Sequence, residues 1–265
     1  MLPKAHITSK DRMTQHRFLV PLLPSHGSVE LPSNEAHHAS RVLRCSTGEE
    51  IVLFDGLGNE ASATIQSIDK RNVTATIKSF EFAPRDHSGR LHFAIAMPKG
   101  DRQRNTIEKL VELGVDSLSP MTTIRSVAVV NEANSERLDR YVVEASKQCG
   151  RNRLMSIRPT IGVSDIHALA TSLSSIGGST DTVVWILHPN IAEQKALTIH
   201  EANSQADGKQ NLLFLVGPEG GFTDDEVREA FEQGARILSL GDRIQRVETA
   251  ASTAAVLGHC WLTPA

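Results

Sequence analysis

The sequence predicts an α/β protein with two domains, a small, mostly β domain at residues 15–83 and a larger parallel-sheet domain at residues 90–265. Three observations lead to this prediction. Short strand-like segments separated by turn signals fill residues 17–82. A polar stretch with proline and glycine at residues 83–90 then provides a linker. Beyond it, apolar strands alternate with helical segments, a pattern typical of a parallel sheet covered on both faces.

The first domain contains four segments with strand character and one short helix. Two segments are apolar runs closed by turn residues, and two alternate polar with β-favouring residues; they are RFLVPLL (17–23), EEIVLFDG (49–56), NEASATIQSI (59–68) and NVTATIKSF (72–80). The turn signals DGLGN (55–59) and DKRN (69–72) separate strands at hairpin spacing. The helix is predicted to begin at a Ser33 N-cap. Together these features predict a small β barrel or sandwich.

The second domain alternates strands with helices. The predicted strands are LHFAIAM (91–97), DSLSPMTT (116–123), DTVVWILHP (181–189), NLLFLVG (211–217) and ARILSLG (235–241). The predicted helices are DRQRNTIEKLVELGV (101–115), SERLDRYVVEASKQCGR (135–151), TDDEVREAFEQG (223–234) and ETAASTAAVLGHCWL (248–262). Ser135 is the expected N-cap of the second helix, and the capping box of Thr223 with Glu226 predicts that the third begins at Asp224. The stretch SLSSIGGST (172–180) is expected to form a flexible loop.

Composition narrows the classes of function. A net charge of −3 argues against a protein coated in positive charge but permits a local basic stripe that binds nucleic acid. Cys45, Cys149 and Cys260 form neither a disulfide framework nor a CxxC metal knuckle, which favours a reducing, cytoplasmic setting. The adjacent His37 and His38 lack a third ligand at metal spacing, so no metal site is expected. The longest apolar run, TVVWIL, is far shorter than a bilayer span, so a soluble protein without a membrane partner is expected.

The stretch LVGPEGGFTDDE (215–226) is a glycine-rich loop between an apolar strand and a helix. The carboxyl end of a parallel strand is where open α/β sheets bind ligands. The loop lacks the lysine of a Walker A motif and the glycine order of a dinucleotide fingerprint, and the acids at the helix start would repel a phosphate. A neutral or cationic ligand therefore fits better. The alternative is that these glycines only make a tight turn.

A second loop, LSLGDRIQRVETAAS (238–252), follows the last strand and leads into a helix of small residues. Two glycine-ended strands imply one shared pocket, although Arg243 and Arg246 could also be solvated surface charges and the small residues could serve tight helix packing. Basic residues also gather in KGDRQR (99–104) and KQCGRNRLMSIR (147–158). They favour a face that contacts phosphates, unless they are ordinary helix-end charges.

LVGPEGGFTDDEV followed by LSLGDRIQRVETAA resembles the two signature segments of the bacterial 16S ribosomal RNA uridine-N3 methyltransferases, members of the SPOUT class. HHASRVLRCSTGEEIVLFDGLGNEASATI is similar to that family's PUA-like RNA-binding domain, and KLVELGVDSLSPMTTIRSV and VVEASKQCGR match the segments expected between them. The four segments occur in the family's order over nearly the full length. The resemblance implies a PUA-like β barrel at residues 15–83 and a SPOUT methyltransferase domain with a trefoil knot at residues 90–265.

The resemblance also implies ligands and partners. S-adenosylmethionine is expected in the knot, held by His188, Leu215, Gly217, Glu219, Gly220, Leu240, Gly241, Ile244, Arg246 and Thr249. The expected substrate is 16S rRNA, free or in the assembled small ribosomal subunit, and the expected form is a homodimer that completes the site. RNA contacts are assigned to Arg17, Arg41, Arg44, Lys147, Gln148 and Arg151.

Methylation of uridine N3 requires a proton to leave and places negative charge on the flanking carbonyl oxygens. We expect Arg246 to stabilise this charge and Glu248 to orient Arg246 or to act as the base. Gln245 and Val247 depart from the family pattern, which has leucine and threonine there. The alternatives are a related SPOUT methyltransferase acting on tRNA, on a ribose 2′-hydroxyl or at another RNA position, and a noncatalytic RNA-binding ribosome-assembly factor.

Overall fold

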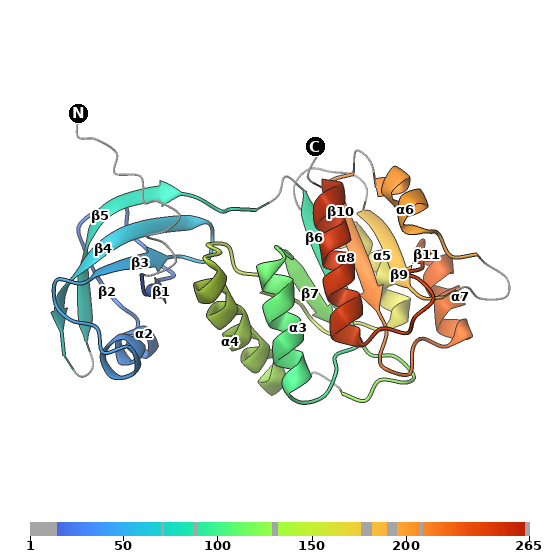
Figure 1. The fold of residues 1–265 in the computed structure, drawn as a ribbon, viewed down its shortest axis with the longest axis horizontal. Helices are drawn as coiled ribbons and strands as arrows, with labels where there is room; N and C mark the ends of the chain where they lie inside the picture. The colour runs from blue at the N-terminus through green and yellow to red at the C-terminus, as the bar shows by residue number, and fades with distance from the viewer. Residues whose placement is uncertain are drawn as a thin grey trace. The chain divides into compact units, whose positions relative to one another are not determined.

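A computed structural model describes residues 15–69, 72–86, 89–128, 132–175, 182–189, 195–206 and 209–262 (Figure 1). Among these, the residues up to 86 together with residues 143–154 form one compact unit, and the others form a second. The helix α4 (Glu132–Cys149) begins in the second unit and ends in the first. Residues 143–154 group with the first unit, although they fall within the predicted second domain at residues 90–265.

The first unit is built on a five-stranded sheet in the order β1-β3-β4-β5-β2. Its strands are β1 (Arg17–Leu19), β2 (Ser28–Glu30), β3 (Glu50–Phe54), β4 (Asn59–Ile68) and β5 (Val73–Phe82). Only the β1–β3 pair in this sheet is parallel. Alternate residues of these strands, such as Ile51, Leu53, Ala63 and Ile65, pack into a core with Phe18 and explain the period-two pattern of the sequence.

A short helical segment packs on this core. The α-helix α2 (Ser33–His37) continues as a π-helical turn at His38–Val42. Pro32 occupies the N-cap position and no side chain caps the helix, so the prediction that Ser33 is the N-cap is wrong by one residue. Proline is suited to a helix start because a backbone N–H at that position would have no intrahelical acceptor, so its absence costs no hydrogen bond.

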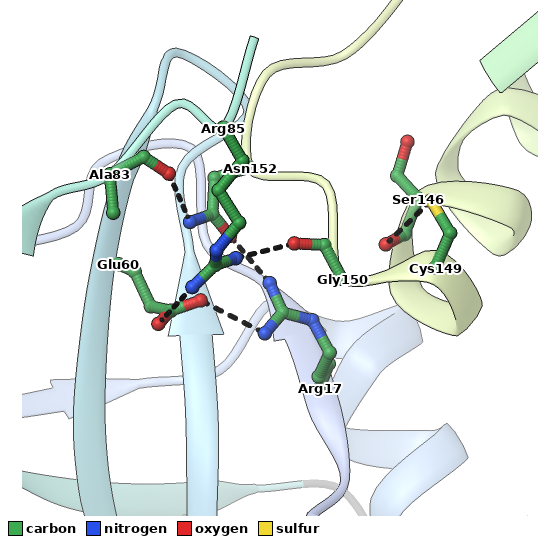
Figure 2. A network of polar contacts seen from close by, with 8 residues as sticks. All are labelled: Arg17, Glu60, Ala83, Arg85, Ser146, Cys149, Gly150 and Asn152. Carbon is green, nitrogen blue, oxygen red and sulfur yellow. Dashed lines mark hydrogen bonds and ion pairs between the residues drawn. The ribbon is translucent and has the colours of Figure 1, made fainter. Parts of the chain in front are cut away.

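A buried ion-pair network joins four parts of the first unit that lie apart in sequence (Figure 2). The Glu60 carboxylate, 1% exposed, accepts from the guanidinium groups of Arg17 (2.9 Å) and Arg85 (2.7 Å). Arg17 also donates to the Asn152 side chain, which in turn donates to the Ala83 carbonyl (2.7 Å). Burial alone would raise the pKa of Glu60, but the hydrogen bonds and charges of Arg85 and Arg17 outweigh it and hold that pKa below its usual value.

The second unit is a six-stranded, fully parallel sheet in the order β11-β9-β10-β6-β7-β8. Its strands are β6 (Arg90–Ile95), β7 (Ser117–Pro120), β8 (Ser156–Ile157), β9 (Thr182–Leu187), β10 (Asn211–Val216) and β11 (Arg236–Leu238). Its other helices are α3 (Asp101–Glu112), α5 (Ile166–Ser174), α6 (Ile199–Ala206), α7 (Asp224–Glu232) and α8 (Val247–Leu262). The parallel α/β architecture predicted from the alternating pattern is confirmed.

Helices cover both faces of this sheet (Figure 1). On one face, Leu213 and Leu215 of β10 pack with side chains of α5 and α7. On the other face, α8 lies so close that a Cβ at Gly258 would be 2.6 Å from Leu91 and 3.0 Å from Phe214. The small residues of α8 therefore serve close helix–sheet packing, which is the structural alternative that the sequence left open.

Several elements differ from the sequence prediction. The helix α4 begins at Glu132, so Ser135 lies inside it and is not its N-cap. Residues 172–174 of the expected loop SLSSIGGST belong to α5, and residues 176–180 lie outside the described part of the chain. The strands β2 and β8 and the helices α5 and α6 were not predicted.

We predict that Glu60→Gln lowers the free energy of unfolding by about 3 kcal/mol, because it leaves the buried charge of Arg17 without its partner. Urea denaturation followed by circular dichroism measures this loss. Since the pKa of Glu60 lies below its usual value, the stabilisation is fully present at neutral pH. It begins to fall near the ordinary glutamate pKa of about 4.3, where the unfolded chain takes up a proton, and it is lost as the pH falls through the lower pKa of the folded protein. Glu50→Gln at the exposed start of β3 is the matched control. Equal stability of the two variants at pH 7 would contradict the prediction.

Candidate active site

A cavity of about 320 Å³ lies where the carboxyl ends of β9, β10 and β11 meet. Three chain segments form most of its wall: residues 187–189 after β9, residues 216–222 after β10, and residues 238–245 with Val247 after β11. Arg125, in the segment that follows β7, and Ala250 of α8 complete the lining. This position is the one expected for ligands in parallel α/β sheets, and the volume is at the lower end of small-molecule sites.

The glycines of the first loop fit its tight path. A Cβ at Gly217 would lie 2.9 Å from the ring of Phe222, a buried cavity residue, so no larger residue fits without moving that ring. Gly221 has a φ of +69°, which favours glycine. Behind the loop, Thr223 and Glu226 form the predicted capping box, and α7 starts at Asp224 as expected.

The second loop turns at Gly241, whose φ of +106° is a conformation that side chains rarely adopt. The Gly241 N–H donates to the hydroxyl of Ser239 (3.2 Å) and so fixes the turn. Both departures from the family pattern lie on this wall. The side chain of Gln245 contacts the Thr253 hydroxyl at 3.5 Å, and Val247, 3% exposed, gives the cavity an apolar surface where a hydroxyl was expected.

The structure places most of the expected cofactor residues together. The cavity is lined by His188, Gly217, Glu219, Gly220, Leu240, Gly241 and Ile244. Leu215 is instead buried in the core on the α5 and α7 face of β10, and neither Arg246 nor Thr249 is among the lining residues. Arg125 and Phe222 were not predicted. Phe222 stands inside the glycine-rich loop 215–226, which could have indicated it. Arg125 stands near the end of the segment KLVELGVDSLSPMTTIRSV, but nothing in that segment ties it to the cavity.

The two residues expected to act in catalysis lie at the start of α8. Arg246 is exposed just before the helix, and Glu248 is partly buried in its first turn. One carboxylate oxygen of Glu248 is buried and has no hydrogen-bond partner within the described residues. No ion pair between Arg246 and Glu248 occurs in this part of the chain, so the expected orienting contact is not formed.

The residues assigned to RNA contacts have two different surroundings. Arg17 and Arg151 are 7% and 6% exposed, and each is paired inside the first unit, with Glu60 and Asp86 respectively. Their assignment as surface RNA contacts is therefore corrected to a structural one. Lys147 is bound to the Glu35 carboxylate at 2.5 and 2.7 Å and is largely buried. The other three are exposed: Arg41, Arg44 and Gln148.

One group of side chains in the described residues has the composition of a metal site, although the sequence predicts none. Potential ligand atoms of His16, Cys45 and Glu49 lie within 4.8 Å of one another. Burial and the neighbouring Glu49 raise the pKa of Cys45 to about 11, so its thiol is protonated at neutral pH and donates to the carboxylate. His16 Nε2 lies 3.7 Å from the Glu49 carboxylate.

Comparison with known proteins identifies the family. A model of an RNA methyltransferase domain matches residues 85–257, and a model of an RNA methyltransferase PUA domain matches residues 31–78. The chain belongs to this RNA methyltransferase family. The predicted combination of a PUA-like domain with an α/β methyltransferase domain is thereby confirmed. None of the helices in the described ranges combines the length and apolar character that crossing a membrane requires.

The relatives of this RNA methyltransferase cover most of its length. It is 31% identical to the ribosomal RNA small subunit methyltransferase E of Rickettsia conorii, over 88% of the chain and 89% of the relative. The Bacillus subtilis protein of that name is 29% identical over 84% and 86%. A putative methyltransferase from Legionella pneumophila, solved with bound SAM, has a TM-score of 0.80 at 29% identity, covering 92% and 96%. The Neisseria gonorrhoeae methyltransferase E, bound to S-adenosyl methionine, has a TM-score of 0.77 at 28% identity, covering 91% and 96%.

Proposed function

We propose that this RNA methyltransferase transfers the methyl group of S-adenosylmethionine to N3 of a uridine in 16S rRNA of the small ribosomal subunit. The observation that carries the proposal is the cavity between the two glycine loops at the carboxyl ends of β9, β10 and β11. Two structural relatives bind S-adenosylmethionine, and the curated relatives named above are small-subunit rRNA methyltransferases. The uridine N3 specificity rests on the resemblance of the two signature loops.

The chemistry of the cavity fits this cofactor. Backbone groups of the loops at Gly217–Gly221 and Ser239–Gly241 are suited to hydrogen-bond an adenine, and Phe222 and Val247 provide apolar surface. Acidic residues stand at the α7 start, which disfavours a phosphate ligand and suits a positively charged sulfonium. When bound, the cofactor supplies an electrophilic methyl group, and the protein has to position the base and manage the charge that develops on it.

We infer that Arg246 stabilises the negative charge that spreads over the uracil carbonyl oxygens when N3 loses its proton. Its exposure at the rim, outside the cavity lining, suits contact with an RNA base rather than with the cofactor. Glu248, with one buried and unpartnered carboxylate oxygen, is the candidate to accept the N3 proton or to orient Arg246 once RNA is bound.

The partners follow from the same proposal. We assign RNA contacts to Arg41, Arg44 and Gln148, which are exposed. We further propose a homodimer in the cytoplasm, formed through a knotted methyltransferase domain and acting on free rRNA or on the assembled small subunit. Ile244 is fully exposed and Ile124 is 74% exposed in the second unit, and burying these side chains against a second copy would stabilise such a dimer.

We predict that Gly217→Ala weakens S-adenosylmethionine binding at least about tenfold, or about 1.4 kcal/mol, because the new Cβ displaces the Phe222 ring, which lines the cavity. Isothermal titration calorimetry measures the change. Gly162→Ala is the control, since its Cβ would meet no atom closer than 3.5 Å. Unchanged affinity of Gly217→Ala would argue against the cavity as the cofactor site.

The function itself is tested by mapping methylated nucleosides in 16S rRNA by mass spectrometry. A deletion strain should lack one uridine N3-methyl group, and restoring the gene should recover it. Loss of a different RNA methyl group would indicate a related SPOUT activity. A complete methylation pattern, together with no cofactor binding by the purified protein, would indicate a noncatalytic RNA-binding factor.

We predict that Arg246→Ala lowers kcat about 100-fold, as expected when one transition-state charge contact is lost, while the Kd for S-adenosylmethionine stays within about twofold of the wild-type value. Single-turnover methylation and calorimetry provide the two measurements. Arg246→Lys should retain part of the rate because it keeps the charge. If Arg246→Ala kept nearly full turnover, Arg246 would not be the residue that stabilises the charge on the uracil.

A further inference from the structure

Arg125 reaches the cofactor loop from a part of the chain far away in sequence. It lies between β7 and α4, and its guanidinium donates to the carbonyl of Gly220 at 2.7 Å and lies 3.5 Å from that of Phe222. Its aliphatic stem packs on the same loop, since a Cβ at Gly220 would be 3.2 Å from the Arg125 Cδ. The Arg125 side chain therefore hydrogen-bonds the carbonyl of Gly220 and packs against its Cα.

A second tie joins the same two segments through a buried carboxylate. The backbone N–H of Ile124 donates to one oxygen of Glu226 at 2.7 Å. The other oxygen accepts from the N–H (2.8 Å) and hydroxyl (3.1 Å) of Thr223. Glu226 is 5% exposed, so these bonds are shielded from water. Adjacent residues of the segment after β7 thus bind the loop at Gly220 and at the start of α7.

The loop would be mobile without such ties. It contains three glycines and one proline between Gly217 and Gly221, and glycines lose more conformational freedom on ordering than other residues. A further side-chain contact on this part of the loop joins Arg102 to Glu219 at 2.7 Å, with side chains 40% and 33% exposed. An ion pair so exposed contributes little. The bond from Arg125 to a backbone carbonyl fixes the peptide itself.

We propose that Arg125 is a positioning residue that preorganises the loop Gly217–Phe222 for cofactor binding. The proposal rests on the proposed function, in which this loop binds S-adenosylmethionine. Holding the Gly220 carbonyl keeps the loop in its binding conformation before the ligand arrives. Without Arg125 only a fraction of the molecules has that conformation, and the apparent Kd rises by the inverse of that fraction.

The test compares Arg125→Ala, Arg125→Lys and Arg228→Ala with the wild-type chain. Calorimetry gives the Kd for S-adenosylmethionine and for 5′-methylthioadenosine, which lacks the amino acid carboxylate. We expect Arg125→Ala to raise both values by the same factor of about ten, while kcat at saturating cofactor and KM for RNA stay near wild type. Arg125→Lys keeps one donor and should recover part of the affinity. Arg228, paired with Asp225 on α7 and outside the cavity lining, should change nothing.

Hydrogen exchange separates preorganisation from loss of one contact. Amides of residues 217–222 in the unliganded Arg125→Ala protein should exchange faster than in the wild type, with α8 unchanged. An unaltered Kd would overturn the proposal. A loss of affinity confined to S-adenosylmethionine would also overturn it, because that result indicates direct binding of the cofactor's carboxylate by Arg125. A fall in kcat or a rise in the KM for RNA, with the Kd for the cofactor unchanged, would overturn it as well. Failure of the wild-type protein to bind either ligand would refute the proposed function instead.

Discussion

The carboxylate of Glu60 is the group around which the first unit is organised. A buried carboxylate is tolerated only if it is paired and its oxygens are hydrogen-bonded. Glu60 meets this requirement with Arg17 from β1 and Arg85 from the chain beyond β5, and Arg17 in turn needs Asn152 from beyond α4. The need to pair this buried charge therefore brings together parts of the chain that the hydrophobic pattern alone would not assemble. It also keeps Arg17 buried instead of exposed at the surface.

In the second unit, the backbone of the glycine loops has to be accessible to a ligand while the loops stay ordered. Its parallel sheet places the ends of β9, β10 and β11 side by side, so loops from distant parts of the sequence share one wall. Glycine lets the backbone approach closely, and its cost in conformational freedom is offset by bonds from outside the loop. The capping box at Glu226 and the guanidinium of Arg125 supply those bonds.

Local signals decided what could be predicted from the sequence. The alternation of strands and helices, the capping box at Thr223 and the glycines of both loops gave the fold class and most of the cavity, because each acts through near neighbours in the chain. Arg125 and the burial of Arg17 depend on contacts between residues far apart in sequence, for which a single sequence has no marker. The N-cap expected at Ser135 failed because α4 starts a turn earlier.

The insertion of residues 143–154 into the first unit has a consequence for biosynthesis. A chain emerging from the ribosome delivers β1 to β5 long before it delivers Asn152 and Gly150, the acceptors for Arg17 and Arg85. Glu60 can pair with both arginines as soon as β4 and the chain beyond β5 have been made, but the bonds to Asn152 and Gly150 form only after α4 has been made. The network around Glu60 is therefore complete only once the chain has been made through residue 152, although domains otherwise tend to fold in the order of their translation.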